Sequence, residues 1–118
     1  MADGLNPPTP SPLWLQTVWK WVTSRVGVVS VTAAYTVPSN IFHVRADVTS
    51  AGFTVTLPAA ATRDGRQISV KKIDASGNTL TLGVTGSDTI DGTATKTTTT
   101  QYASWLVISN GNTGWDLL

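Results

Sequence analysis

Short segments rich in β-branched residues constrain the fold of this 118-residue chain more than any other feature of its sequence. They recur at roughly ten-residue spacing, and turns containing Gly, Asn, Asp and Ser separate them. The segments cover residues 28–37, 41–48, 53–57, 67–73, 79–84 and 104–108. Short strands with this spacing are typical of two-sheet sandwiches and of barrels. We therefore predict a mainly β fold, a small antiparallel β-sandwich or barrel-like domain over residues 28–118.

The composition and the alternation of side chains support this prediction. Thr occupies 20 positions and all seven acidic residues are Asp, so a strand former is abundant and the helix former Glu is absent. Alternation predicts an inward-facing apolar set: Phe53, Val55, Leu57, Ile68, Val70, Ile73, Leu80 and Leu82. Residues 93–100 are almost entirely polar on both faces. We expect them to form an edge strand that pairs with another subunit.

The first 27 residues differ from the rest, and we predict an N-terminal arm and an anchoring helix there. Four of the six prolines lie at positions 7, 8, 10 and 12, which favours an extended Pro-rich arm. The apolar residues that follow recur with helical spacing at Leu15, Val18, Trp19, Val22 and Val26. Ser11 and Pro12 suit the start of a helix, and Gly27 suits its end. The alternation over residues 18–22 fits a strand equally well, so both interpretations stay open.

Three of the five tryptophans, Trp14, Trp19 and Trp21, lie in this N-terminal segment. Their spacing places them on more than one side of a helix, so one apolar stripe cannot bury all three. Because Trp is enriched at the centre of protein interfaces, we expect the segment to dock into a partner. The predicted partner-binding residues are Trp14, Leu15, Val18, Trp19, Trp21 and Val22. The alternatives are packing on the chain's own β-domain and binding to a membrane surface, for which only Lys20 and Arg25 could meet anionic lipid.

Composition also excludes several functional classes. The chain has no Cys, hence no disulfide, thiolate nucleophile or Cys-based metal site. A net charge of +1 with 13% charged residues argues against binding nucleic acid through its phosphates. No apolar run approaches the roughly 20 residues of a membrane-spanning helix. The first residues lack the basic start of a secretory signal, so we expect a soluble protein made in the cytoplasm.

No group of residues predicts catalysis or metal binding. His43 is the only histidine, and its strand context favours a half-buried structural position, because no nucleophile or orienting group is evident for a general base. Asp88 and Asp91 lie in a turn sequence, and two carboxylates fall short of the six to eight oxygens that calcium takes. The glycines lack phosphate-loop spacing. We therefore expect no catalytic residues, no cofactor and no metal.

Six further side chains are candidates for ligand contact: Arg63, Arg66, Lys71, Lys72, Trp105 and Trp115. Adjacent residues on a strand point to opposite faces, so Lys71 and Lys72 do not form a patch. Solvated surface is the favoured interpretation for all four basic residues, and an anionic ligand such as a surface polysaccharide is the alternative. For Trp105 and Trp115, a core or subunit contact is favoured over stacking on a sugar.

The β region resembles a small β-module that recurs in tailed-bacteriophage virion proteins, notably tail-fibre, head-fibre and decoration proteins. The segments that carry the resemblance are 34–37, 44–47, 53–60, 68–74, 78–82, 88–92 and 110–115. Together they extend over residues 34–118, about 70% of the chain. Each segment is weakly specific, and their order along the chain is what is distinctive.

The resemblance implies a non-enzymatic virion structural protein, often trimeric, that is assembled in the host cytoplasm. Because one β-module directly follows a short leader, we expect a capsid decoration or short head-fibre protein. Its implied partners are other virion proteins of the capsid or tail and two further copies of itself, with no nucleic acid and no membrane. The alternative is a tail-fibre receptor-binding or glycan-binding module, with a host surface glycan as its partner. A polysaccharide depolymerase is disfavoured, because the sequence offers no acid/base pair.

Overall fold

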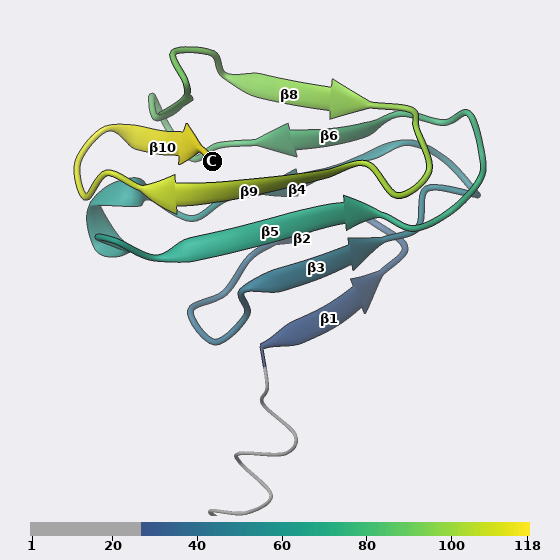
Figure 1. Cartoon of the computed structure of the whole chain (residues 1–118), viewed down its shortest axis with the longest axis horizontal. Helices are drawn as coiled ribbons and strands as arrows, with labels where there is room; N and C mark the ends of the chain where they lie inside the picture. The colour runs from purple at the N-terminus through teal and green to yellow at the C-terminus, as the bar shows by residue number, and fades with distance from the viewer. Residues whose placement is uncertain (1–26) are drawn as a thin grey trace, which may run out of the picture.

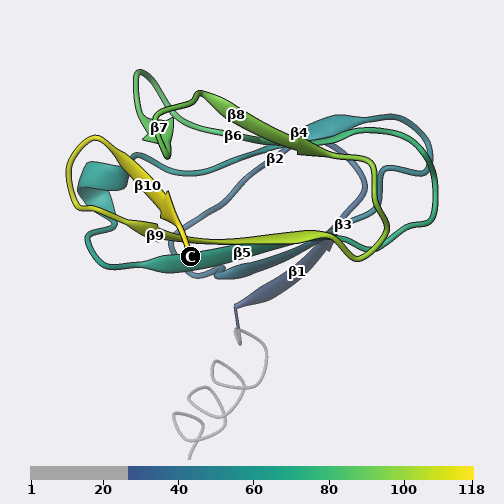
Figure 2. The same cartoon turned by 45° about the horizontal axis from the view of Figure 1, so that its top comes forward.

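The computed structural model describes residues 27–118, which form two β-sheets that lie face to face (Figures 1 and 2). The six-stranded sheet contains, in spatial order, β1 (Val28–Val31), β3 (His43–Ala46), β5 (Gln67–Lys72), β9 (Ser104–Ser109), β10 (Gly114–Leu117) and β7 (Thr89–Ile90). The four-stranded sheet contains β2 (Tyr35–Thr36), β4 (Phe53–Thr56), β6 (Leu80–Gly83) and β8 (Thr95–Thr98). A single 3₁₀ turn, η1 (Ala60–Thr62), precedes β5. The prediction of a mainly β, two-layer domain is confirmed.

The chain winds between the two sheets instead of folding back on itself. From β1 to β6, consecutive strands alternate between the sheets, and each pairs in parallel with the strand two positions earlier. This is the winding of a β-helix, in which each coil adds one strand to each sheet. Only β5–β9, β9–β10 and β6–β8 are antiparallel among the eight strand pairs of the described region. The prediction of an antiparallel domain was therefore wrong.

Parallel pairing is possible here, without long loops or helices, because each pair of parallel neighbours is connected through a strand of the opposite sheet. Parallel neighbours need a long connection, and here the intervening strand of the opposite sheet supplies it. The segment 28–37 illustrates this, because it bends at residues 32–34 and contributes β1 to one sheet and β2 to the other. A turn that crosses to the second sheet has the same local composition as a hairpin turn, so the sequence does not distinguish them.

The predicted polar edge strand over residues 93–100 is present as β8, at the end of the four-stranded sheet. It pairs with β6 of the same chain, with Leu80 opposite Thr98 and Leu82 opposite Lys96. Strand β10 was not predicted, because its Gly and Asn neighbours read as a continuous turn. The predicted Pro-rich arm and N-terminal helix lie outside the described residues.

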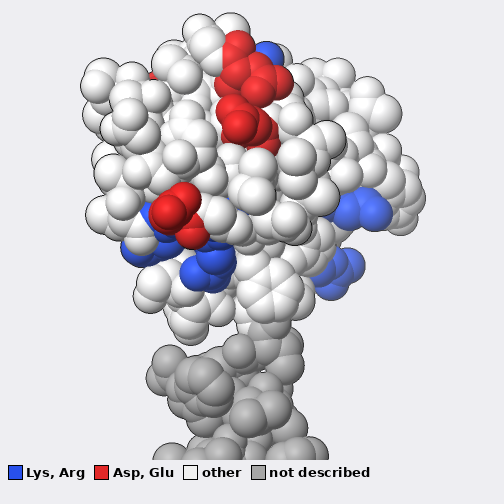
Figure 3. Space-filling view, turned by 60° about the vertical axis from the view of Figure 1, so that its left-hand side comes forward, with Lys and Arg blue, Asp and Glu red and all other residues white. Residues whose placement is uncertain are grey.

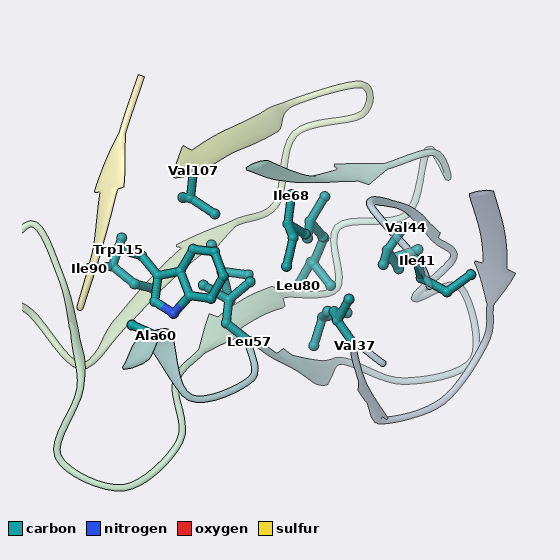
Figure 4. Packing of buried hydrophobic residues seen from close by; sticks show 14 of the residues in the cluster. Val37, Ile41, Val44, Leu57, Ala60, Ile68, Leu80, Ile90, Val107 and Trp115 are labelled. Carbon is teal, nitrogen blue, oxygen red and sulfur yellow. The ribbon is translucent and has the colours of Figure 1, made fainter. Parts of the chain in front are cut away.

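The core lies between the sheets (Figure 4) and is built by alternation along the strands. Six of the residues predicted to face inward are fully buried: Val55, Leu57, Ile68, Val70, Leu80 and Leu82. Phe53 and Ile73 are half-buried. Each fully buried side chain of this size stabilises the fold by about 1.5–3 kcal/mol. All buried hydrophobic residues of the described region lie between Val37 and Trp115, so the domain has a core of its own.

Trp115 closes one end of this core, against Leu57, Ala60 and Ile90 (Figure 4). Its indole is 1% exposed, and Nε1 donates a hydrogen bond to the carbonyl oxygen of Pro58 at 3.2 Å. A buried indole that has satisfied its only donor is held in place and cannot stack on a sugar. The core interpretation of Trp115 is confirmed, and the sugar-stacking alternative is wrong for this residue.

Candidate interaction surfaces

The outer face of the six-stranded sheet carries a row of five outward-pointing side chains, three of which are exposed and apolar. In the strand register, Val28, His43, Ser69 and Leu106 lie side by side on β1, β3, β5 and β9. Their neighbours along each strand point inward, so these four side chains point outward. Leu118 continues the row, because its N–H donates to the carbonyl oxygen of Leu106 at 2.8 Å. The exposed fractions are 47% for Val28, 41% for Leu106 and 67% for Leu118.

Charged side chains of both signs flank this row. On one side, Arg45 and Lys71 are paired in register on β3 and β5, and the Lys71 ammonium lies 5.4 Å from the centroid of the Tyr102 ring. On the other side, Asp116 of β10 is exposed next to Ile108 of β9. We call the row together with these flanking charges the outer face. It presents apolar, cationic and anionic groups on one flat surface.

His43 lies in the middle of the outer face, as the half-buried structural residue that the sequence predicted. Its Nδ1 is hydrogen-bonded to the Ser69 hydroxyl. Burial lowers the pKa of His43, and the positive charges of Lys71 and Arg45 lower it further, so the imidazole is neutral at pH 7.

Ser69 is a nucleophile type within reach of His43, which the sequence did not reveal because the two residues are 26 positions apart. A Ser–His nucleophile also uses an orienting group and an oxyanion site. Within residues 27–118, no carboxylate is hydrogen-bonded to His43, and the Ser69 N–H donates to the Phe42 carbonyl in the sheet ladder. The arrangement therefore supports a structural hydrogen bond.

The outer face of the four-stranded sheet has a different chemistry. Thr54, Thr81 and Thr97 form one row across β4, β6 and β8. Thr56 and Thr95 lie in the next row, on either side of Gly83. The exposed apolar surface of the two-sheet domain is thus concentrated on the six-stranded sheet.

A shallow hollow opens beside η1 and is lined by Ser39, Thr62, Arg63, Asp64, Gly65 and Arg66. The Arg66 Nη2 donates to the Ile41 carbonyl at 2.9 Å, and the Arg63 Nη1 donates to the Thr62 carbonyl at 3.0 Å. Neither guanidinium forms a salt bridge with a carboxylate of the described region. Figure 3 views this end of the domain, where acidic and basic side chains lie next to one another. A hollow of mixed sign agrees with solvated surface for both arginines.

The prediction that Lys72 lies on the solvated surface was wrong. Lys71 and Lys72 point to opposite faces as expected, but Lys72 points into the core and has no exposed surface. Its Nζ donates to Asp74 Oδ2 and to the Asp74 carbonyl, both at 3.0 Å, and to the Ser76 carbonyl at 2.6 Å. A lysine can be buried here because all three of its N–H groups have acceptors and one acceptor is a carboxylate.

Asp74 is the centre of this buried cluster. Its carboxylate accepts hydrogen bonds from the Val48 N–H at 2.9 Å, the Ser76 N–H at 3.0 Å, the Ser76 hydroxyl and the Lys72 ammonium. Burial alone raises the pKa of Asp74, but the hydrogen bonds from Ser76, Val48 and Lys72 outweigh it, so the pKa lies far below its usual range. The cluster ties two loops to the end of β5, which is a structural role.

The two aspartates of the turn sequence also bind backbone. Asp88 Oδ2 accepts a hydrogen bond from the Ala60 N–H at 2.8 Å, and Asp91 Oδ1 accepts one from the Leu117 N–H at 3.1 Å. They hold η1 and the end of β10 in place, as the turn interpretation predicts. In residues 27–118, no helix is long and apolar enough to cross a membrane.

The predicted partner-binding residues Trp14, Leu15, Val18, Trp19, Trp21 and Val22 lie outside the described residues. Val28, Leu106 and Leu118 were not among the candidates predicted from the sequence. A signal was present, because residues 28–29 and 105–108 are apolar at consecutive positions and so place apolar side chains on both faces of a strand. Comparison with known proteins adds no assignment: no family model matches the chain, and no curated protein matches its sequence.

Proposed function

We propose that the protein is a non-enzymatic structural protein of a bacteriophage virion, a capsid decoration or short head-fibre protein. In this proposal the N-terminal segment attaches to the capsid or tail, and the β-domain is displayed as a homotrimer. The observation that carries the proposal is that, among the described residues, all buried hydrophobic side chains lie between Val37 and Trp115 and form one core, against which Val29, Val31, Tyr35 and Leu117 pack. A domain with its own core leaves the tryptophan-bearing leader to serve an attachment role.

The use of the polar groups supports a non-enzymatic role. His43, Asp74, Asp88 and Asp91 are each hydrogen-bonded to the domain's own backbone or side chains. Catalytic acids and bases reach a substrate position in a cleft, whereas none of these four residues lines the hollow beside η1. The loops of the domain are held by hydrogen bonds to Asp74, Asp88 and Asp91. A rigid domain of this kind is well suited to display on the surface of a particle.

Trimeric association would strengthen attachment by avidity. Burying one large apolar side chain contributes about 1.5–3 kcal/mol, so a single leader with few such residues binds weakly or moderately. Three linked leaders raise the apparent affinity by a factor of about 10² or more when all can engage at once.

Attachment is tested by adding purified full-length protein to phage particles that lack it. We expect Trp19→Ala to reduce occupancy on the particles strongly, with the β-sheet circular dichroism signal unchanged. The matched control is Thr81→Ala on the threonine face, which should attach like the wild type. Unchanged occupancy with Trp19→Ala would overturn the anchoring role.

A tail-fibre receptor-binding or glycan-binding module is the second candidate. The observation that favours it is the hollow beside η1, where Arg63 and Arg66 have no carboxylate partner within residues 27–118. Guanidinium groups in this state suit a carboxylate of an acidic sugar. Binding of the wild type to an array of acidic glycans, abolished by Arg66→Gln, would favour this candidate.

A further inference from the structure

We infer that the outer face of the six-stranded sheet is the surface through which copies of this chain contact one another. The inference rests on the proposed homo-oligomer and names the surface that forms it. Its centre is the apolar row of Val28, Leu106 and Leu118, and its flanks are the charges of Arg45, Lys71 and Asp116.

The first observation is the concentration of exposed apolar side chains. Among the described residues, five large hydrophobic side chains are exposed, and three of them lie in this one row. The row runs from β1 to the end of β10, across four strand spacings, or about 19 Å. Leu106 and Leu118 are neighbours in this row, and His43 and Ser69 separate them from Val28. Scattered apolar residues are normal on a protein surface, and the grouping of these three on one face is the feature that favours an interaction site.

The second observation is the contrast between the two outer faces. The four-stranded sheet presents threonine rows, which water solvates well, while the six-stranded sheet presents valine and leucine. Both faces belong to the same small domain, so the difference is not explained by a need for core material. The buried core of the described residues lies between the sheets and does not involve the outward-pointing side chains of either face.

The third observation is the distribution of charge, which selects the occupant. A surface for nucleic acid or anionic lipid would carry positive charge throughout. Here Arg45 and Lys71 lie on one side of the apolar row and Asp116 lies on the other. When three copies turn this face toward a common threefold axis, the cationic side of one copy meets the anionic side of the next, so opposite charges are opposed.

The middle of the row is compatible with burial. His43 is neutral at pH 7 and is hydrogen-bonded to Ser69, so neither side chain would enter an interface as an unpaired charge. Buried polar groups cost little when they are hydrogen-bonded to each other. The ammonium of Lys71 lies over the Tyr102 ring, which offers a partner for that charge when water is removed.

The test compares two aspartate substitutions in the full-length protein. Leu106→Asp places a charge at the centre of the outer face, and Thr81→Asp places the same charge in the threonine row, on β6, as a matched control. Molar mass is measured by light scattering over a hundredfold range of concentration. We expect the wild type and Thr81→Asp to form the same oligomer, and Leu106→Asp to dissociate at concentrations at least tenfold higher than the wild type does.

Two results would overturn the inference. If the wild type is monomeric over the whole range, the proposed oligomer is refuted. The attachment role of the N-terminal segment is then decided independently by the experiment with Trp19→Ala. If Leu106→Asp forms the same oligomer as the wild type, the outer face is not the surface through which the copies contact one another. If that variant also exposes residues 1–26 to protease, the leader is the occupant instead. Should Leu106→Asp fail to fold, Leu118→Asp at the chain terminus carries the same test.

Discussion

Replacing Asp74 by Ala removes the counter-charge of a lysine that has no exposed surface. The substitution deletes the 3.0 Å salt bridge to Lys72 Nζ and leaves the N–H groups of Val48 and Ser76 without their acceptor. Removing one partner of a buried ion pair costs about 3–5 kcal/mol, because the remaining charge stays buried and uncompensated. Domains of this size have about 5–15 kcal/mol of total stability, so the variant should lose about a fifth or more of it.

Lys72→Met removes the other partner of the ion pair, together with the three hydrogen bonds of its ammonium. Met fills most of the volume of the lysine stem, and the Asp74 carboxylate keeps its bonds from Val48 and Ser76. The expected loss is about 1–3 kcal/mol, smaller than for Asp74→Ala. The double variant should lose less than the sum of the single losses, because the two residues interact directly.

Urea unfolding followed by circular dichroism measures these free energies of unfolding. The matched control is Asp64→Ala, which removes an exposed carboxylate and should change stability by less than about 0.5 kcal/mol. If Asp74→Ala is no more destabilised than this control, the buried ion pair does not stabilise the fold and the argument is refuted.

The same pair predicts a dependence of stability on pH. The pKa of Asp74 is far below its ordinary value of 3.8 in the folded protein, so the folded state binds its proton less readily than the unfolded state does. Its contribution is therefore complete above the ordinary pKa and decreases as the pH falls below 3.8 toward the folded pKa. Asp74→Asn should remove this part of the acid-induced loss of stability.

Two further changes have expected outcomes. Gly111→Ala should destabilise the domain by about 1–3 kcal/mol in urea unfolding, because the backbone has φ +78° and the new Cβ would lie 2.5 Å from an Asp64 carboxylate oxygen; Gly77→Ala, with open space around it, should be near neutral. Because the pKa of His43 is lowered by burial and by nearby positive charges, stability should fall as the pH drops below 6.5, and equal pH profiles for the wild type and His43→Gln would refute this.

The strands and their inward faces follow from the sequence by itself. The alternation at Val55 and Leu57, at Ile68 and Val70 and at Leu80 and Leu82 places each pair on one side of its strand. This pattern depends only on the geometry of an extended chain, in which neighbouring side chains point to opposite faces. Local information was therefore sufficient for the existence of most strands and for much of the core.

The tertiary structure alone decided how the strands pair, which polar groups are buried and which apolar groups are exposed. Parallel pairing depends on which strand each new strand joins after the chain has crossed to the other sheet. A turn that leads into a hairpin and a turn that crosses to the other sheet have similar sequences. Lys72 can be buried because the loop that follows β5 places acceptor oxygens of Asp74 and Ser76 within hydrogen-bond distance of its ammonium. The outer face exists because Val28, Leu106 and Leu118, far apart in sequence, are brought into one row by the register of four strands and the chain end. Such contacts are non-local, and a sequence pattern records only the preferences of neighbouring residues.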